Sequence, residues 1–166
     1  MRKVVTFLAC FLASASFLHA DDNTAAVLRS KLAEAGPLRI VFSRVSVSPS
    51  GEVLSGSDGT LEIQFPCFYV TVDNFDIFGD DKVMWYRDKA SDEIMVSDSE
   101  LDKLLSFVSL PPDGKPAVLD YKFADGSQSK FKVLAVEKMA SRWPESHFVL
   151  DDASLGENTV VTDLRK

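Results

Sequence analysis

Residues 56–85 read GSDGTLEIQFPCFYVTVDNFDIFGDDKVMW, and this stretch decides the fold. Apolar and polar residues alternate along two segments that meet at Pro66, and the apolar positions are Leu61, Ile63, Phe65, Phe68, Val70 and Val72. A period of two is typical of β-strands with one buried face and one face in water. The stretch therefore predicts paired strands whose apolar face must be covered by the same chain, a partner or a lipid.

The stretch continues through an acidic turn at 79–81 into an aromatic strand that contains Val83 and Trp85. Aspartates cluster around this turn, at positions 73, 76, 80 and 81, but they lack the Asp-x-Asp-x-Asp-Gly spacing and the distal glutamate of a calcium loop. We expect a solvated turn here and no metal site.

The first 20 residues have the pattern of a secretory signal peptide. Arg2 and Lys3 precede an apolar run that extends to Leu18, and the small Ala20 comes just before two aspartates. The apolar run before Cys10 is about six residues, shorter than the roughly 7 to 15 of a signal core, which argues against lipidation at Cys10. We expect a signal peptide at 1–20, export, and a single domain at 21–166.

Charge and cysteine content restrict the possible partners of the exported chain. The sequence has 18 Lys and Arg against 25 Asp and Glu, so loss of Arg2 and Lys3 leaves a net charge of about −9. This acidity argues against nucleic acid and anionic membranes as partners. Cys67 is the one cysteine after the signal, so no intramolecular disulfide is expected. No apolar run of about 18 residues follows the signal to span a membrane.

Two amphipathic helices are predicted. The first covers 23–35 and stops at Gly36-Pro37, with Ala25, Leu28, Leu32 and Ala35 on one side. The second begins at Ser97, which forms a capping box with Glu100, and its apolar side is formed by Leu101, Leu104, Leu105 and Val108.

Further strands are predicted on both sides of the opening stretch. The segment 38–48 changes its apolar phase, which suggests a bulge near Ser43 and Arg44. Asp125-Gly126 indicates a hairpin between two later strands. The remaining predicted strands cover 93–97, 117–123, 129–138, 148–150 and 159–164. The order of these elements gives no parallel crossover and predicts an α+β, mainly β protein, in which a single antiparallel sheet curls around helices.

These residues, taken in order, carry a resemblance to the LolA family, the periplasmic carriers of outer-membrane lipoproteins. It covers nearly the whole chain after the signal. The matching features are the first helix, Phe42-Ser43-Arg44, Gly51, Gly56, Gly59-Thr60-Leu61, Ile63, Pro66, Phe68, Trp85-Tyr86, Phe148 and the ending Val161-Thr162-Asp163-Leu164-Arg165. Two positions depart from the family: Phe65 stands where a basic residue helps to latch the helical lid, and Arg44 replaces a common glutamine. The chain thus resembles a divergent member.

The resemblance implies an incomplete β-barrel with helices packed against its concave face, over an apolar cavity that receives acyl chains. It also implies a monomer in the periplasm of a Gram-negative bacterium, an inner-membrane donor complex, an outer-membrane receptor and acylated lipoprotein or lipid as cargo, with no cofactor. The candidate lining residues are Phe42, Ile63, Phe65, Phe68, Val70, Trp85, Ile94, Leu101 and Leu104. The same side chains could instead form an ordinary core.

No motif indicates an enzyme. Cys67 and His147 have the order of a thiol protease pair, but a cysteine between Pro66 and Phe68 in a strand is expected to be inert. His147 is expected on the surface at a strand start, and Trp143-Pro144 in a rigid loop. Two functions remain open: a carrier that shields acyl chains on their way to the outer membrane, and an envelope interaction or sensor module whose core is filled.

Overall fold

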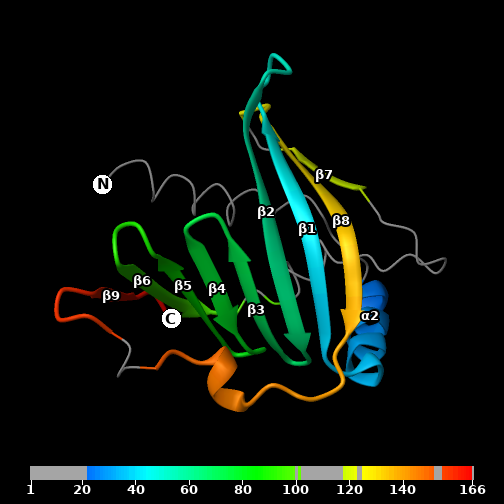
Figure 1. Cartoon of the computed structure of the whole chain (residues 1–166), viewed down its shortest axis with the longest axis vertical. Helices are drawn as coiled ribbons and strands as arrows, with labels where there is room; N and C mark the ends of the chain where they lie inside the picture. Colours follow the sequence, from blue (N-terminus) through cyan, green and yellow to red (C-terminus); the bar gives the residue numbers. More distant parts are fainter. Residues whose placement is uncertain (1–21, 100, 102–117, 123–124, 152–154, 166) are drawn as a thin grey trace.

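The computed structural model describes residues 22–99, 101, 118–122, 125–151 and 155–165. They form a mainly β fold built on one nine-stranded sheet, with strand order β7-β8-β1-β2-β3-β4-β5-β6-β9 (Figure 1). The predicted mainly β class is therefore confirmed. The predicted signal peptide and Cys10 lie outside the described residues.

The strands follow each other as hairpins for most of the chain. Their bounds are β1 (Leu38–Val47), β2 (Val53–Gln64), β3 (Cys67–Val72), β4 (Phe75–Gly79), β5 (Val83–Asp88), β6 (Glu93–Asp98), β7 (Val118–Lys122), β8 (Gln128–Lys138) and β9 (Val160–Asp163). Long β1 and β2 project as a hairpin beyond the β3–β6 part of the sheet (Figure 1). Of the predicted strands, only 148–150 is missing.

The expectation of a purely antiparallel sheet without a parallel crossover is wrong, and the sheet is not closed into a barrel. β9 pairs with β6 in parallel, and the sheet stays open because its outermost strands, β7 and β9, are not neighbours. The chain travels from the Lys138 end of β8 to the Glu93 end of β6 before β9 begins, so β9 runs in the direction of β6. Sequence order could not reveal this return, because β9 pairs with a strand more than 60 residues earlier.

The first predicted helix is confirmed as α2 (Asp22–Ala35), which ends where Gly36 adopts a φ of +76°. Leu32 is fully buried in the apolar core and Ala35 packs beside it, whereas Val27 is exposed. The described side chains of α2 therefore make only a narrow contact with the core, which does not support the amphipathic character that was expected of this helix.

The predicted start of the second helix at Ser97 is wrong, because β6 continues through Ser97 to Asp98. The Leu101 amide instead donates to the hydroxyl of Ser99, at 3.3 Å. Ser99 in turn donates to the Asp80 carbonyl at 2.5 Å, which ties this turn to the β4–β5 connection. The rest of the predicted helix lies outside the described residues.

The irregularity predicted near Ser43 and Arg44 does not lie in β1 itself but in its partner strand. β1 pairs without a shift against β2 from Leu38 to Ser46, and Arg44 follows Phe42 on the same face. The irregularity lies in β8, where Leu134 falls between the partners of Val41 and Phe42. The alternation of apolar residues in β1 is interrupted because Arg44 is buried at a core-facing position, where an apolar residue would continue the pattern.

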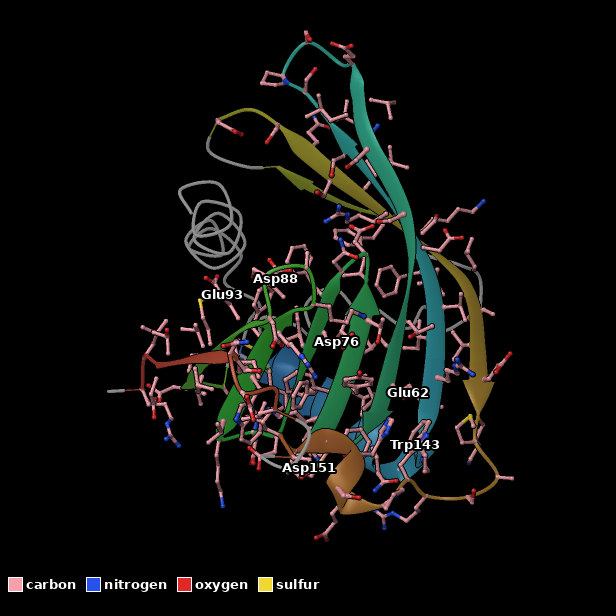
Figure 2. The ribbon with its side chains drawn as sticks, turned by 60° about the vertical axis from the view of Figure 1, so that its left-hand side comes forward. Glu62, Asp76, Asp88, Glu93, Trp143 and Asp151 are labelled. Carbon is pink, nitrogen blue, oxygen red and sulfur yellow. The ribbon has the colours of Figure 1, made fainter. Side chains whose placement is uncertain are left out.

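Both faces of the central sheet are covered, so the expected wet face is wrong for β3 to β6. We call the face that packs on α2 the helix face. The opposite face is crossed by residues 139–151, the strap, which contains the short 3-10 helix η2 (Glu145–Phe148). Figures 1 and 2 show α2 and the strap on opposite sides of the sheet. Phe148 belongs to η2 instead of a strand, and its side chain is buried, as is that of Phe78.

Close packing at Gly59 gives a direct test of the β1–β2–β3 register. Gly59 lies between Phe42 and Val72, and a Cβ atom there would collide with the Phe42 ring and lie 2.8 Å from the Thr71 carbonyl oxygen. We expect Gly59→Ala to lower the free energy of unfolding by about 1–3 kcal/mol, the usual cost of overpacking. Urea denaturation measures this change.

Gly56→Ala is the matched control, because the nearest atom to its added Cβ would be the Arg44 carbonyl oxygen at 3.8 Å. Equal stabilities of the two variants would contradict the packing described for Gly59.

Candidate binding site

The helix face presents ordered rows of side chains across neighbouring strands. Directly paired residues on one face of a sheet lie side by side, so the register defines each row. One row is Leu38, Ile63, Phe68, Gly79 and Met84, the next is Ile40, Leu61, Val70, Ile77 and Tyr86, and the third is Phe42, Gly59, Val72, Phe75 and Asp88. The first two rows are almost entirely apolar, and the third ends in a carboxylate.

Six of the nine predicted lining residues meet in one apolar cluster on this face. They are Phe42, Ile63, Phe65, Phe68, Val70 and Leu101, and Leu32 of α2 belongs to the same cluster. Ile63 and Phe68 are each only 1% exposed. Burial of side chains of this size is worth roughly 1.5–3 kcal/mol each, so the cluster is a main source of stability.

Trp85 and Ile94 do not join this cluster, because they alternate with Met84, Tyr86 and Met95 and so face the strap side. Trp85 stacks on Phe78 there, with ring centroids 5.8 Å apart, and Ile94 is fully buried. Leu104 lies outside the described residues. The sequence indicated that Trp85 was in a strand but gave no independent marker of which face it used.

The sequence prediction missed several members of the cluster. Leu61, Ile77 and Met84 are buried beside the predicted residues, and so is the ring of Tyr86. Continued alternation through 75–79 and 84–86 was the signal that could have identified them, since Ile77 is the direct partner of both Val70 and Tyr86.

The apolar rows end in a polar cluster, which we define as Arg44, Asp73, Tyr86 and Asp88. The guanidinium of Arg44 lies 3.0 Å from the Asp73 carboxylate, and Arg44 is 7% exposed. Buried Asp88 accepts a hydrogen bond from the Ala90 amide at 2.8 Å. Figure 2 shows Asp88 beside Glu93, its cross-strand partner. One end of the helix face is therefore charged, while the other end is apolar.

The hydroxyl of Tyr86 lies buried within this polar cluster. Its ring stacks on Phe75 at a centroid distance of 5.2 Å, its side chain is 5% exposed, and its oxygen is buried without a hydrogen-bond partner in the described structure. Burial, followed by the negative charge of Asp88, raises the pKa of Tyr86 well above its ordinary value, so the phenol is a neutral donor at physiological pH. An unsatisfied buried hydroxyl costs about 1–3 kcal/mol.

The opposite face is closed by the strap. The Gln64 amide group donates to the Trp143 carbonyl at 3.2 Å and accepts from the Trp143 amide at 2.8 Å. His147 Nε2 lies 2.6 Å from Glu62 Oε2, and its ring stacks on Trp143 and meets Tyr69 edge-on. The prediction that His147 stands at a strand start is therefore wrong, because it belongs to η2, where the strap folds its half-buried side chain onto the sheet.

The acidic cluster predicted at the turn is divided among separate partners. Asp73 pairs with Arg44, whereas buried Asp76 accepts from the Lys89 ammonium at 2.9 Å. Asp80 accepts from the Lys82 and Val83 amides and so shapes the turn. Asp76 thus differs from the solvated residue that was expected. The described residues contain no group of three potential metal ligands.

Cys67 is a free, half-buried thiol next to the strap. Burial, followed by the negative charge of Asp80, raises the pKa of Cys67, which disfavours the thiolate needed for nucleophilic attack. Nor is its supposed partner free to activate it, because His147 is committed to Glu62 and stacked on Trp143.

No helix among the described residues is both long and apolar enough to cross a membrane.

Comparisons with known proteins assign this chain to no family. No family model matches the sequence, and no curated protein matches it. Among solved structures, the chain is similar to an uncharacterized conserved protein from Thermus thermophilus, with 10% identity and a TM-score of 0.49 over 86% of this chain and 98% of that chain. A similarity at this level names no function.

The reciprocal Gln64–Trp143 contact predicts how the strap is held. Gln64→Leu would leave both backbone groups of Trp143 without their partner, so we expect a loss of about 1–3 kcal/mol in the free energy of unfolding. Urea denaturation measures the loss, and hydrogen exchange at the Trp143 amide should accelerate.

Gln128→Leu, at the half-buried start of β8, is the control and should leave both measurements unchanged. Unchanged exchange at Trp143 in Gln64→Leu would contradict the proposed attachment.

Proposed function

We propose that this protein is a LolA-like periplasmic carrier that binds the acyl chains of lipoproteins or lipids on the helix face of its sheet. The observation that carries this proposal is the continuous apolar surface of β1 to β5, where five predicted lining residues meet in one cluster with Leu32 of α2 and with the sixth, Leu101. The helix face would be the concave face of the curled sheet, and the helical cover would move aside when cargo enters.

The energetics of acyl burial support a binding role for such a surface. Removing one CH₂ from water is worth about 0.8 kcal/mol, so a sixteen-carbon chain would contribute about 12 kcal/mol before entropic costs. An acylated protein that crosses an aqueous compartment needs shielding of this size. The same energy hinders release, so transfer would require a donor complex at the inner membrane and a stronger receptor at the outer membrane.

Phe65 supports a lid that differs from the family's basic latch. Its side chain packs against the apolar cluster, at the position where the LolA family carries a basic residue. In the proposed carrier, closure would therefore depend on apolar contact, such as that of Leu32 on α2, rather than on hydrogen bonds from a cation. A cover held by few side chains can open at modest cost.

Binding of a fluorescent fatty acid to the purified protein tests the carrier function. We expect saturable binding by the wild type, and a raised midpoint of urea unfolding because a ligand stabilises the state that it binds. Val70→Gln, within the apolar cluster, should weaken binding at least tenfold. Val53→Gln, at a position 65% exposed, should leave binding unchanged.

Near-ultraviolet circular dichroism establishes whether each variant is folded, and Val72→Gln, at a half-buried position of the same face, replaces Val70→Gln if the latter unfolds. Mass spectrometry of the protein purified from its native envelope provides the second measurement. The carrier function is refuted if no lipid or acylated protein copurifies and the probe does not bind.

The projecting β1–β2 hairpin favours a second candidate function, that of an envelope interaction or sensor module. Val53 and Leu54 are 65% and 62% exposed near its tip. In the described part of the sheet, β2 pairs with β3 only from Gly59 onward, so residues 53–58 have β1 as their one neighbour. An exposed strand edge with apolar side chains is suited to pairing with an extended segment of another protein.

A photo-crosslinking amino acid at Leu54 distinguishes this second function in intact cells. The interaction module predicts one discrete crosslinked protein at Leu54 and none from the same group at exposed Glu157. Equal labelling at both positions would count against a specific hairpin contact.

A further inference from the structure

Tyr86 places a hydrogen-bond donor at the end of the apolar rows. It lies in the second row, directly beside Ile77, and its hydroxyl oxygen is buried with no partner in the described structure. Buried polar groups in folded proteins nearly always have a partner, so an exception of this kind calls for one that the described residues do not supply. Because a protonated phenol can donate one hydrogen, a ligand group that accepts a hydrogen bond would satisfy it.

The charges around Tyr86 restrict the nature of that acceptor. Asp88 and Arg44 both act on the phenol, and the effect of Asp88 exceeds that of Arg44. Arg44 is itself neutralised by Asp73 at 3.0 Å, and Glu93 pairs directly with Asp88 across β5 and β6. Among the described residues, this part of the helix face thus contains the carboxylates of Asp73, Asp88 and Glu93 and the guanidinium of Arg44. A ligand that brought a further negative charge here would be repelled.

We propose that Tyr86 binds the neutral carbonyl group of an ester- or amide-linked acyl chain, and that the protein thereby prefers such ligands to free fatty acids. This inference rests on the proposed function, because it needs an acyl chain along the apolar rows. The chain would lie over Leu61, Val70 and Ile77, and its carbonyl would accept from the Tyr86 hydroxyl. Asp88 would then exclude a carboxylate or phosphate at the same position.

Recognition of a neutral carbonyl agrees with the chemistry of the proposed cargo class. An acyl chain joined to glycerol or to an amino group carries no charge at its first carbon, whereas a free fatty acid is ionised at neutral pH. When a ligand lacks a hydrogen-bond acceptor, the buried donor of the site stays without a partner. Such a site therefore discriminates strongly against ligands that lack the acceptor. Tyr86 therefore supplies specificity, while the apolar rows supply affinity.

Competition against a fluorescent acyl probe at pH 8 tests this inference with two ligands of equal chain length, N-methyldodecanamide and dodecanoate. The wild type should bind the amide more tightly. Tyr86→Phe should weaken amide binding about 3- to 10-fold, as expected for loss of one hydrogen bond, and leave dodecanoate binding nearly unchanged. Asp88→Asn should strengthen dodecanoate binding about threefold or more, because a repulsive charge is removed.

Tyr69→Phe is the matched control, since it removes a phenol hydroxyl on the strap face. It should change neither ligand's affinity. Because the Tyr86 hydroxyl has no partner in the described structure, Tyr86→Phe should unfold at the wild-type temperature or above, so misfolding is not expected to obscure the result.

The outcomes separate this inference from the carrier function. Unchanged amide binding in Tyr86→Phe, or tighter binding of dodecanoate than of the amide by the wild type, would overturn the role of Tyr86 and leave acyl binding intact. Failure of the wild type to bind the probe or either ligand would overturn both.

Discussion

The register of β2 between β1 and β3 is the constraint on which the rest of the structure depends. Side chains alternate between the faces of a strand, so a slip of one residue would turn Leu61 and Ile63 away from α2 and bring Glu62 into the core. Gly59 secures this register, because the Phe42 ring occupies the space where any other residue would place its Cβ. With β2 fixed, hairpin pairing carries the same phase outward through β6.

This register also separates two kinds of surface. The strap face is closed by specific polar contacts, in which Gln64 holds the backbone of Trp143 and Glu62 meets His147. Among the described side chains of α2, Leu32 and Ala35 contact the helix face, and both are apolar and make no directional bonds. Apolar contact is nondirectional and can be exchanged for a ligand of similar character, whereas the strap would lose geometry-dependent hydrogen bonds. For this reason the helix face is the better candidate for reversible binding.

The two ends of the helix face differ, because one end carries the polar cluster and the other end is apolar. Arg44 and Asp73 form an ion pair, and Asp88 receives a backbone hydrogen bond, so both carboxylates of the polar cluster have partners within the fold. The Tyr86 hydroxyl has no hydrogen-bond partner in the described structure. The alternation of the sequence identifies Tyr86 only as a strand residue. Whether its hydroxyl has a hydrogen-bond partner depends on three-dimensional packing, which the alternation does not show.

The sequence by itself determined the mainly β class, the first helix, most strands and the hairpin turn at Asp125-Gly126, because these depend on local alternation and turn chemistry. It also identified six residues that meet on one face. Only the tertiary structure decided that Trp85 and Ile94 lie on the other face, that Phe148 belongs to a 3-10 helix within the strap, and that β9 returns in parallel to β6. Those features arise from contacts between segments far apart in the chain, and local spacing carries no information about which distant surface will cover a strand.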